Sequence, residues 1–216
     1  MVKKKSILLV AATHEELEGF PTNMSGVNVF LTGVGVVNSL YSLQKHLTEH
    51  PDYKIVVQAG IAGSYRMDLK PGTVVNVVSE CFGDTGLERS EGFQTLFESG
   101  FDSAGRFPYD KGRIVNPHSI SFPSNLSQVL GLTVAMACGT ERTARLRAMK
   151  FNADVESMEG ASLFYVCKQM GIPFVQLRSV SNFCGPGDHA QWDIPLAVKN
   201  LKQTLTSYIN RLHHEI

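Results

Sequence analysis

The sequence lacks several features that mark large classes of proteins. Its 216 residues carry 20 basic and 20 acidic side chains, so there is no positive excess to meet nucleic-acid phosphates or an anionic membrane surface. The apolar stretch Ile7–Ala12 is too short for a signal peptide or a membrane span. Internal repeats, low-complexity tracts and linkers are also missing. We therefore expect a cytoplasmic protein that forms one domain over residues 1–216 and binds neither nucleic acid nor membrane.

Three kinds of chemical site are also poorly represented. No GxSxG elbow is present, which argues against a serine hydrolase. His46 and His50 stand four residues apart before Pro51, where they complement a helix dipole, and no third ligand has a suitable spacing, so we expect no metal. The cysteines form no CxxC pair and are interpreted as buried thiols rather than a disulfide framework. They are Cys81, Cys138, Cys167 and Cys184.

Short apolar runs rich in β-branched residues alternate with helical patterns. Runs that are apolar at nearly every position are typical of strands buried on both faces. Residues 36–47 have apolar side chains at helical spacing, and a longer apolar stripe extends from Ile194 to Leu212. This alternation predicts an α/β fold, a three-layer αβα sandwich around a mixed sheet. The expected strands are Ser6–Ala12, Val27–Leu31, Lys54–Ala59, Thr73–Ser79, Leu132–Ala137 and Pro173–Val180.

The carboxyl ends of these strands are where ligands bind in such sheets. Thr32–Gly35 follows one strand, but Asn38 stands where a dinucleotide fingerprint has its third glycine, so a tight turn is favoured over a nicotinamide site. Gln58–Ser64 leaves room for a ligand and lacks Arg and Lys, which disfavours a tightly held phosphate. The segment from Cys81 to about Asn116 has no clear periodicity, and we expect it to form a loop near the site.

Carboxylates occur at two of these ends. Glu16 follows Thr13 at the spacing of a capping box, which explains it as well as a catalytic role does. Glu156 and Glu159 stand at the expected start of a helix that runs to about Met170, where the helix dipole favours acidic residues. Small residues follow Glu159, so its carboxylate is also a candidate to hold paired ribose hydroxyls.

An amide lies at the end of the last expected strand. Ser181 and Asn182 lead into a turn-rich loop, where they either satisfy the loop backbone or recognise a base. Trp192 in that loop either packs or forms a wall for an aromatic ligand, and Asp193 is expected to cap the last helix. The residues alone therefore indicate a small-molecule α/β enzyme with carboxylates and an amide at strand ends.

Taken together, the segments resemble the purine nucleoside phosphorylase and nucleosidase superfamily, in order and over nearly the whole chain. The resemblance implies a nucleoside phosphorylase-like fold, cleavage of a purine–ribose bond by water, no cofactor, and a homodimer or larger homo-oligomer. The matching segments are the Glu16 turn, Thr32–Gly35, Ala59–Gly63, Met158–Ala161 and Arg178–Asn182.

The same resemblance implies roles for individual residues. Glu16 resembles the glutamate that activates water, Glu159 the one that clamps ribose, and Asn182 the group that holds the purine, so these three are the expected catalytic residues. The expected substrate-binding residues are Ile61, Gly63, Thr140, Met158, Arg178, Ser181 and Trp192, with Phe82 as a weaker candidate.

Within the superfamily, the futalosine hydrolases are the most similar group; they release hypoxanthine and dehypoxanthine futalosine in an alternative route to menaquinone. This resemblance rests on residues 82–93 and on Asn182, where adenosine-type nucleosidases carry an aspartate. An asparagine NH2 group can donate to the N7 and O6 acceptors of a 6-oxopurine, although asparagine also pairs with adenine edges. The aromatic carboxylate of futalosine should meet a cation, and the candidates are Arg89, Arg106 and Arg142.

Other functions stay open at this point. A methylthioadenosine/S-adenosylhomocysteine nucleosidase and a purine nucleoside phosphorylase are the alternative enzymes, and aminodeoxyfutalosine is an alternative substrate. The alternative outside enzymes is a nucleoside-binding protein with a degenerate site.

Overall fold

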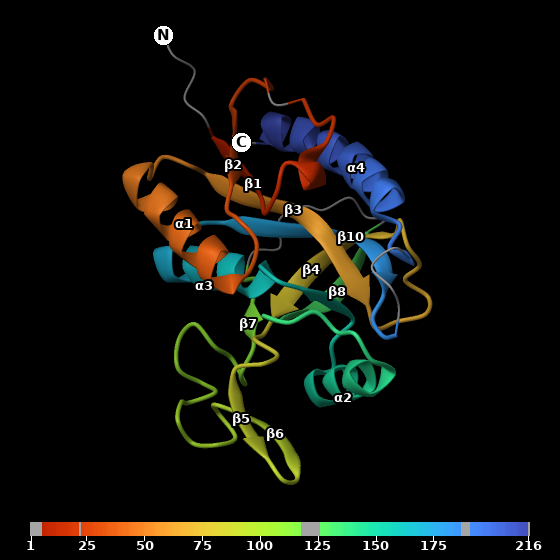
Figure 1. The fold of residues 1–216 in the computed structure, drawn as a ribbon. Coiled ribbons are helices and arrows are strands. Elements are labelled where there is room, and N and C mark those ends of the chain that lie inside the picture. Colours follow the sequence, from red (N-terminus) through yellow and green to blue (C-terminus); the bar gives the residue numbers. More distant parts are fainter. Residues whose placement is uncertain (1–5, 22, 118–125, 187–190, 216) are drawn as a thin grey trace.

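Eight strands form the central sheet of the computed structural model, which describes residues 6–21, 23–117, 126–186 and 191–215 (Figure 1). Their order is β10-β4-β8-β9-β3-β1-β2, and β7 pairs with β4. The strands are β1 (Ile7–Ala11), β2 (Val27–Leu31), β3 (Ile55–Ser64), β4 (Val74–Glu80), β7 (Ile114–Val115), β8 (Ser127–Thr133), β9 (Val155–Ser157) and β10 (Phe174–Phe183).

The sheet is mixed, as predicted. Strand β3 pairs in parallel with β1 and β10, whereas β9 is antiparallel to β3 and β4 is antiparallel to β10. Because β10 and β9 flank β3, the pairings β10-β4-β8-β9-β3 close into a ring. This closure brings the ends of β3, β9 and β10 together at one place.

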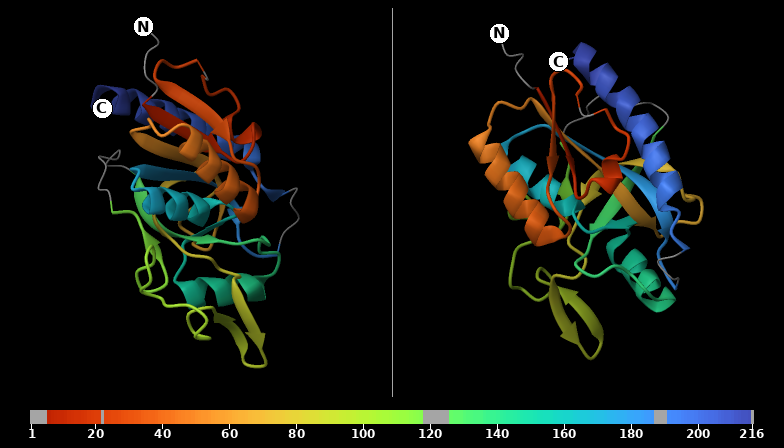
Figure 2. Two further views of the ribbon diagram at one scale, coloured as in Figure 1. Left: turned by 90° about the vertical axis from the view of Figure 1, so that its left-hand side faces the viewer. Right: turned by 45° about the horizontal axis from the view of Figure 1, so that its top comes forward.

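Helices cover both faces of the sheet and give the three predicted layers (Figures 1 and 2). Side chains alternate along β1, so that Leu8 and Val10 pack in one core cluster and Ile7 and Leu9 in the other. Helices α1 (Val36–Glu49) and α3 (Gly160–Met170) contribute to the first cluster, and α4 (Ile194–Glu215) contributes to the second. The helical stripe that ends at Leu212 therefore packs on the sheet as expected.

Several expected element boundaries differ from the structure. Strand β3 continues past Ala59 to Ser64, and β10 continues past Val180 to Phe183. The strand predicted over Leu132–Ala137 is β8, which ends at Thr133. Val134 N still donates to Ser157 O of β9, and the chain then turns toward α2 (Glu141–Phe151). The helix predicted to include Glu156 begins only at Gly160, and Glu156 belongs to the short strand β9. These shifts decide which side chains reach the site.

The segment expected to form a loop near the site has structure of its own. It contains a hairpin of β5 (Gly86–Arg89) and β6 (Gly92–Thr95), which projects away from the sheet (Figures 1 and 2). No residue from 81 to 116 lines the main cavity among the residues described. The segment therefore adds no side chain to the cavity lining, although Asp84 Oδ2 accepts a hydrogen bond of 2.6 Å from Ala135 N beside it.

Two smaller predictions, the helix cap at Asp193 and the free thiols, are confirmed. Asp193 Oδ1 accepts a hydrogen bond of 3.1 Å from Leu196 N in the first turn of α4. All four cysteines are free, and Cys184 alone is only partly buried. His46 stacks on Phe30, and its Nε2 lies 3.1 Å from the hydroxyl of Tyr53. None of the helices in the described ranges combines the length and apolarity that a membrane span needs.

Candidate active site

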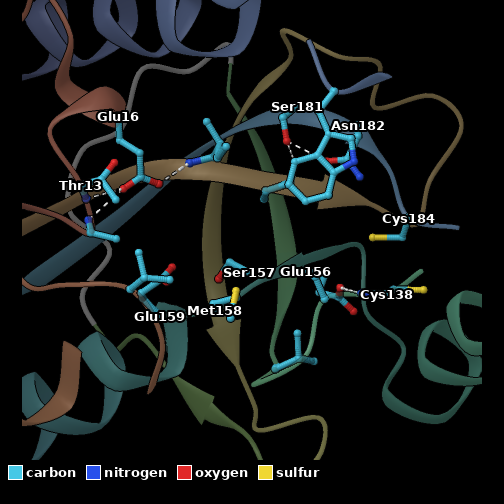
Figure 3. Close-up of a pocket in the computed structure, with 18 residues that line it drawn as sticks. Thr13, Glu16, Cys138, Glu156, Ser157, Met158, Glu159, Ser181, Asn182 and Cys184 are labelled. Atoms are coloured by element: carbon cyan, nitrogen blue, oxygen red, sulfur yellow. Dashed lines mark hydrogen bonds between the residues drawn. The ribbon is translucent and has the colours of Figure 1, made fainter. Parts of the chain in front are cut away.

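A cavity of about 310 Å³ lies at the carboxyl ends of the strands (Figure 3). Its walls come from the ends of β3 and β10, from β9, and from the segments that follow β1, β2 and β8. Eight of the residues predicted from the sequence line this cavity: Glu16, Ile61, Gly63, Met158, Glu159, Ser181, Asn182 and Trp192. The strand-end rule therefore located the cavity correctly.

Glu16 is held in the cavity wall by backbone amides. It lies in a short 3₁₀ helix (Glu15–Leu17) directly after β1 and is only 9% exposed. Its Oε1 accepts from Ile61 N at 3.0 Å, and its Oε2 accepts from Ala12 N at 2.8 Å and Thr13 N at 3.3 Å. The bond to Thr13 N is one half of the predicted capping box. These bonds aim the carboxylate at the end of β3.

Burial raises the pKa of Glu16 above the ordinary value of a glutamate. Arg178 opposes this rise, and the nearby Glu159 adds to it. A carboxylate with a raised pKa is a stronger base than one in water, which suits proton abstraction near neutral pH.

Glu159 is fixed at the start of α3 opposite Glu16. It is the residue before the first turn, and its Oε1 accepts from Gly35 N at 2.9 Å. Gly35 has φ of 88°, a conformation that L side chains rarely adopt, so a glycine is needed for its amide to reach Glu159. The glycine turn Thr32–Gly35 thus positions a carboxylate, in agreement with its interpretation as a turn.

Arg178 lies beneath the cavity and not in its lining. It is 1% exposed, and its Nη1 lies 3.9 Å from Glu16 Oε1 and 3.8 Å from Glu159 Oε2. A Cβ atom at Gly60 would lie 2.1 Å from the same Nη1, so only glycine leaves room for this guanidinium. Arg178 therefore differs from the prediction of a substrate-binding residue: it contacts the two carboxylates.

Ser181 and Asn182 form a polar pair at the other side of the cavity. The hydroxyl of Ser181 donates to Asn182 Oδ1 at 2.8 Å, and Asn182 Nδ2 donates to Phe183 O at 3.0 Å. An amide NH2 group has two hydrogens, so one remains for a ligand. Ser181 therefore fixes the orientation of the Asn182 amide at the cavity.

The structure does not bring the remaining candidates into the cavity. Thr140 caps α2 by accepting from Thr143 N at 3.1 Å, so its side chain serves the helix start. Phe82 lines separate cavities beside the projecting segment. The arginines suggested for a substrate carboxylate are also outside the lining: Arg89, Arg106 and Arg142.

Sequence reasoning missed Glu156 and Cys138, which line the cavity. Glu156 was interpreted as a first-turn helix residue, and a strand pattern over Val155–Ser157 would have placed it on the same face as the cavity. Cys138 directly follows an expected strand, where ligands are expected to bind, but it was interpreted only as a buried thiol. The described residues contain no group of three or more His, Cys, Asp or Glu side chains arranged to hold a metal ion.

Comparison with known proteins identifies relatives of this chain. Futalosine hydrolase from Thermus thermophilus is 29% identical over 177 residues, which are 81% of this chain and 77% of that protein. The solved futalosine hydrolase of Helicobacter pylori superimposes with a TM-score of 0.76 at 20% identity, covering 98% of this chain and 99% of the other. The 5'-methylthioadenosine/S-adenosylhomocysteine nucleosidase of Helicobacter pylori gives the same TM-score and identity, over 98% and 100%.

The similarity to solved structures confirms the predicted nucleoside phosphorylase-like fold. It does not separate the two enzyme names, because both structures match equally. The family model described as the phosphorylase superfamily matches residues 20–211, which is most of the chain. This chain therefore belongs to the phosphorylase superfamily.

Proposed function

We propose that this protein is a nucleosidase that hydrolyses the N-glycosidic bond of futalosine and releases hypoxanthine. The observation that carries the proposal is the cavity in which Glu16 and Glu159 share one buried guanidinium, with Asn182 at the opposite side. One relative found by sequence similarity and one found by structural similarity are both named futalosine hydrolase, which supports this substrate.

The two carboxylates have different roles at the sugar: Glu159 acts on the ribose and Glu16 on the attacking water. As the bond from the anomeric carbon to N9 breaks, its electron pair leaves with the purine and positive charge builds on the ribose. Glu159 holds ribose hydroxyls and stabilises that charge electrostatically. Glu16 takes a proton from water while the water oxygen bonds to the anomeric carbon. Arg178 is a positioning residue, since it does not line the cavity and its guanidinium contacts Glu16, Glu159 and the neighbouring strand residue Gln58.

Asn182 acts on the purine. Its free amide hydrogen donates to the N7–O6 edge of the leaving base, where negative charge develops. Because an amide has no proton to give up, the purine takes its proton from solvent. Met158 and Trp192 also line the cavity and add apolar surface to its wall.

The lining also favours hydrolysis over phosphorolysis. Among the described residues, neither lysine nor arginine lines the cavity. A phosphate dianion at the anomeric carbon would usually need such a partner. Water is therefore the proposed nucleophile.

The experiment is to incubate purified protein with futalosine, aminodeoxyfutalosine, methylthioadenosine and inosine and to identify the released base. Hypoxanthine from futalosine is the expected result. Adenine from methylthioadenosine without turnover of futalosine would favour the second candidate, which the equal match to the methylthioadenosine nucleosidase structure supports. Binding of nucleoside without release of any base would instead indicate a binding protein.

A further inference from the structure

Glu156, Gly63 and Asn182 form one row across three neighbouring strands. Gly63 of β3 pairs with Glu156 of β9 on one side and with Asn182 of β10 on the other. Paired residues on adjacent strands direct their side chains to the same face of a sheet. All three residues line the cavity. The row therefore places a carboxylate and an amide on either side of a glycine.

Gly63 keeps the floor between these side chains open. A Cβ atom at this position would lie 2.7 Å from Cys184 Sγ and 3.3 Å from Asn182 Nδ2. The two outer strands are about 9–10 Å apart, twice the usual strand spacing. That separation leaves room for a flat ring held from both edges.

Glu156 is held rigidly by three donors. Arg147 Nη1 donates to its Oε2 at 2.9 Å, and the Tyr65 hydroxyl donates to the same oxygen. Burial and then the charge of Glu156 raise the pKa of Tyr65, so the phenol keeps its proton and acts as the donor. Cys138 N donates to Oε1 at 2.7 Å. These contacts explain why a glutamate that is 6% exposed is tolerated here.

Oε1 of Glu156 has a second lone pair that none of these donors uses. A carboxylate offers about four acceptor positions, and the ion pair with Arg147 engages only Oε2. Figure 3 shows Glu156 and Cys138 at the end of the cavity away from Glu16, with Ser157 and Met158 between. A purine whose N9 lies near Glu159 would extend its opposite edge, which carries N1, toward Glu156.

The two kinds of purine differ at that edge. A 6-oxopurine carries a hydrogen on N1, whereas N1 of a 6-aminopurine is a bare acceptor that a carboxylate repels. We propose that Glu156 is a specificity-determining residue that accepts the N1–H of a 6-oxopurine while Asn182 donates to its N7–O6 edge. This inference rests on the proposed function of the same cavity and explains its choice of base.

The test measures binding of hypoxanthine, 1-methylhypoxanthine and adenine by calorimetry, without any turnover. The wild-type protein should bind hypoxanthine at least about tenfold more tightly than either other base, the scale of one hydrogen bond to a charged group. Glu156→Gln should weaken the binding of hypoxanthine by at least about tenfold. The same variant should shift the preference toward adenine, because an amide can donate a hydrogen bond to the bare N1 of adenine. Glu49→Gln makes the same change at an exposed glutamate at the far end of α1 and should alter nothing.

An unchanged hypoxanthine-to-adenine ratio in Glu156→Gln would overturn the assignment. If that variant does not fold, the binding measurements on the wild-type protein still test the assignment. Equal binding of 1-methylhypoxanthine and hypoxanthine would overturn the assignment, since the methyl group removes the N1 donor. Failure of the proposed function is distinguishable, because a protein that ranks the bases as expected but cleaves no nucleoside contradicts only the hydrolysis.

Discussion

Arg178 Nη1 lies 3.9 Å from Oε1 of Glu16, in a layer of buried charge directly beneath the cavity. The same nitrogen lies 3.8 Å from Glu159 Oε2, so one guanidinium balances two carboxylates that face the proposed reaction centre. Without that cation, burial and the charge of Glu159 would raise the pKa of Glu16 further. A buried residue of the sheet, Arg178, therefore influences the protonation of Glu16 in the cavity wall.

Glu16→Gln tests the base directly. The amide keeps the size of the side chain but cannot take a proton from water, so kcat should fall by at least about a hundredfold. Binding of hypoxanthine should stay within about twofold, because Glu16 lies at the opposite end of the cavity from Glu156 (Figure 3). A loss of tenfold or less would remove Glu16 from this role.

The pH dependence of kcat should report the raised pKa of Glu16. Activity requires the deprotonated carboxylate, so the rate should rise with pH through that pKa and then level off. Arg178 lowers this pKa, and Arg178→Gln should therefore move the acid limb to higher pH. Arg178→Lys keeps the positive charge, so the acid limb of its pH profile should lie closer to that of wild type. An acid limb that is the same in Arg178→Gln as in wild type would contradict the role of the guanidinium.

Glu80 should make stability depend on pH. It is fully buried at the end of β4, where Thr133 Oγ1 donates to its Oε2 at 3.0 Å, and burial raises its pKa to about 7. A raised carboxyl pKa contributes stability at low pH that is lost as pH rises through 7, by up to about 3 kcal/mol. Urea unfolding at pH 5 and pH 8 should show this loss in wild type.

Glu80→Gln mimics the protonated form and should flatten that difference. Its free energy of unfolding should exceed that of wild type at pH 8 if the side-chain hydrogen bonds are kept. Equal pH dependence in the two proteins would show that Glu80 is not the group that titrates.

Gly60→Ala should disturb the charged layer without adding any polar group. The new Cβ would lie 2.1 Å from Arg178 Nη1 and 2.6 Å from Glu16 Oε1, so both side chains must move. A misplacement of this size at a catalytic group should cost about a hundredfold in kcat/KM. Gly105→Ala is the matched control, because nothing lies within 4 Å of its Cβ. Similar activity in both variants would contradict the tight packing at Gly60.

The sequence predicted the fold and eight of the 18 residues that line the cavity, for a clear physical reason. Buried parallel strands need apolar residues at nearly every position, and the runs around Ile7–Ala11 and Phe174–Val180 carry that signal strongly. Ligand groups at the ends of such strands then meet at one edge. Glu16, Glu159 and Asn182 were placed in this way, although nearly 170 residues separate the first from the last.

The residues that were misplaced owe their positions to contacts made in the folded structure, such as strand register, and not to periodicity in the sequence. Glu156 lies in a three-residue strand that is too short to show alternation, so only its register with Gly63 brings it to the cavity. Arg178 lies in the middle of a strand, and its contacts beneath the floor follow from the absence of a side chain at Gly60. Thr140 lies close in sequence to Cys138, but the start of α2 directs it away.

Release of hypoxanthine from futalosine, measured with and without inorganic phosphate, tests the central claim most directly. We expect steady release of hypoxanthine in phosphate-free buffer and an unchanged rate when phosphate is added. The second product should be a free sugar rather than a sugar phosphate. Release that begins only on addition of phosphate, or no release under either condition, would contradict it.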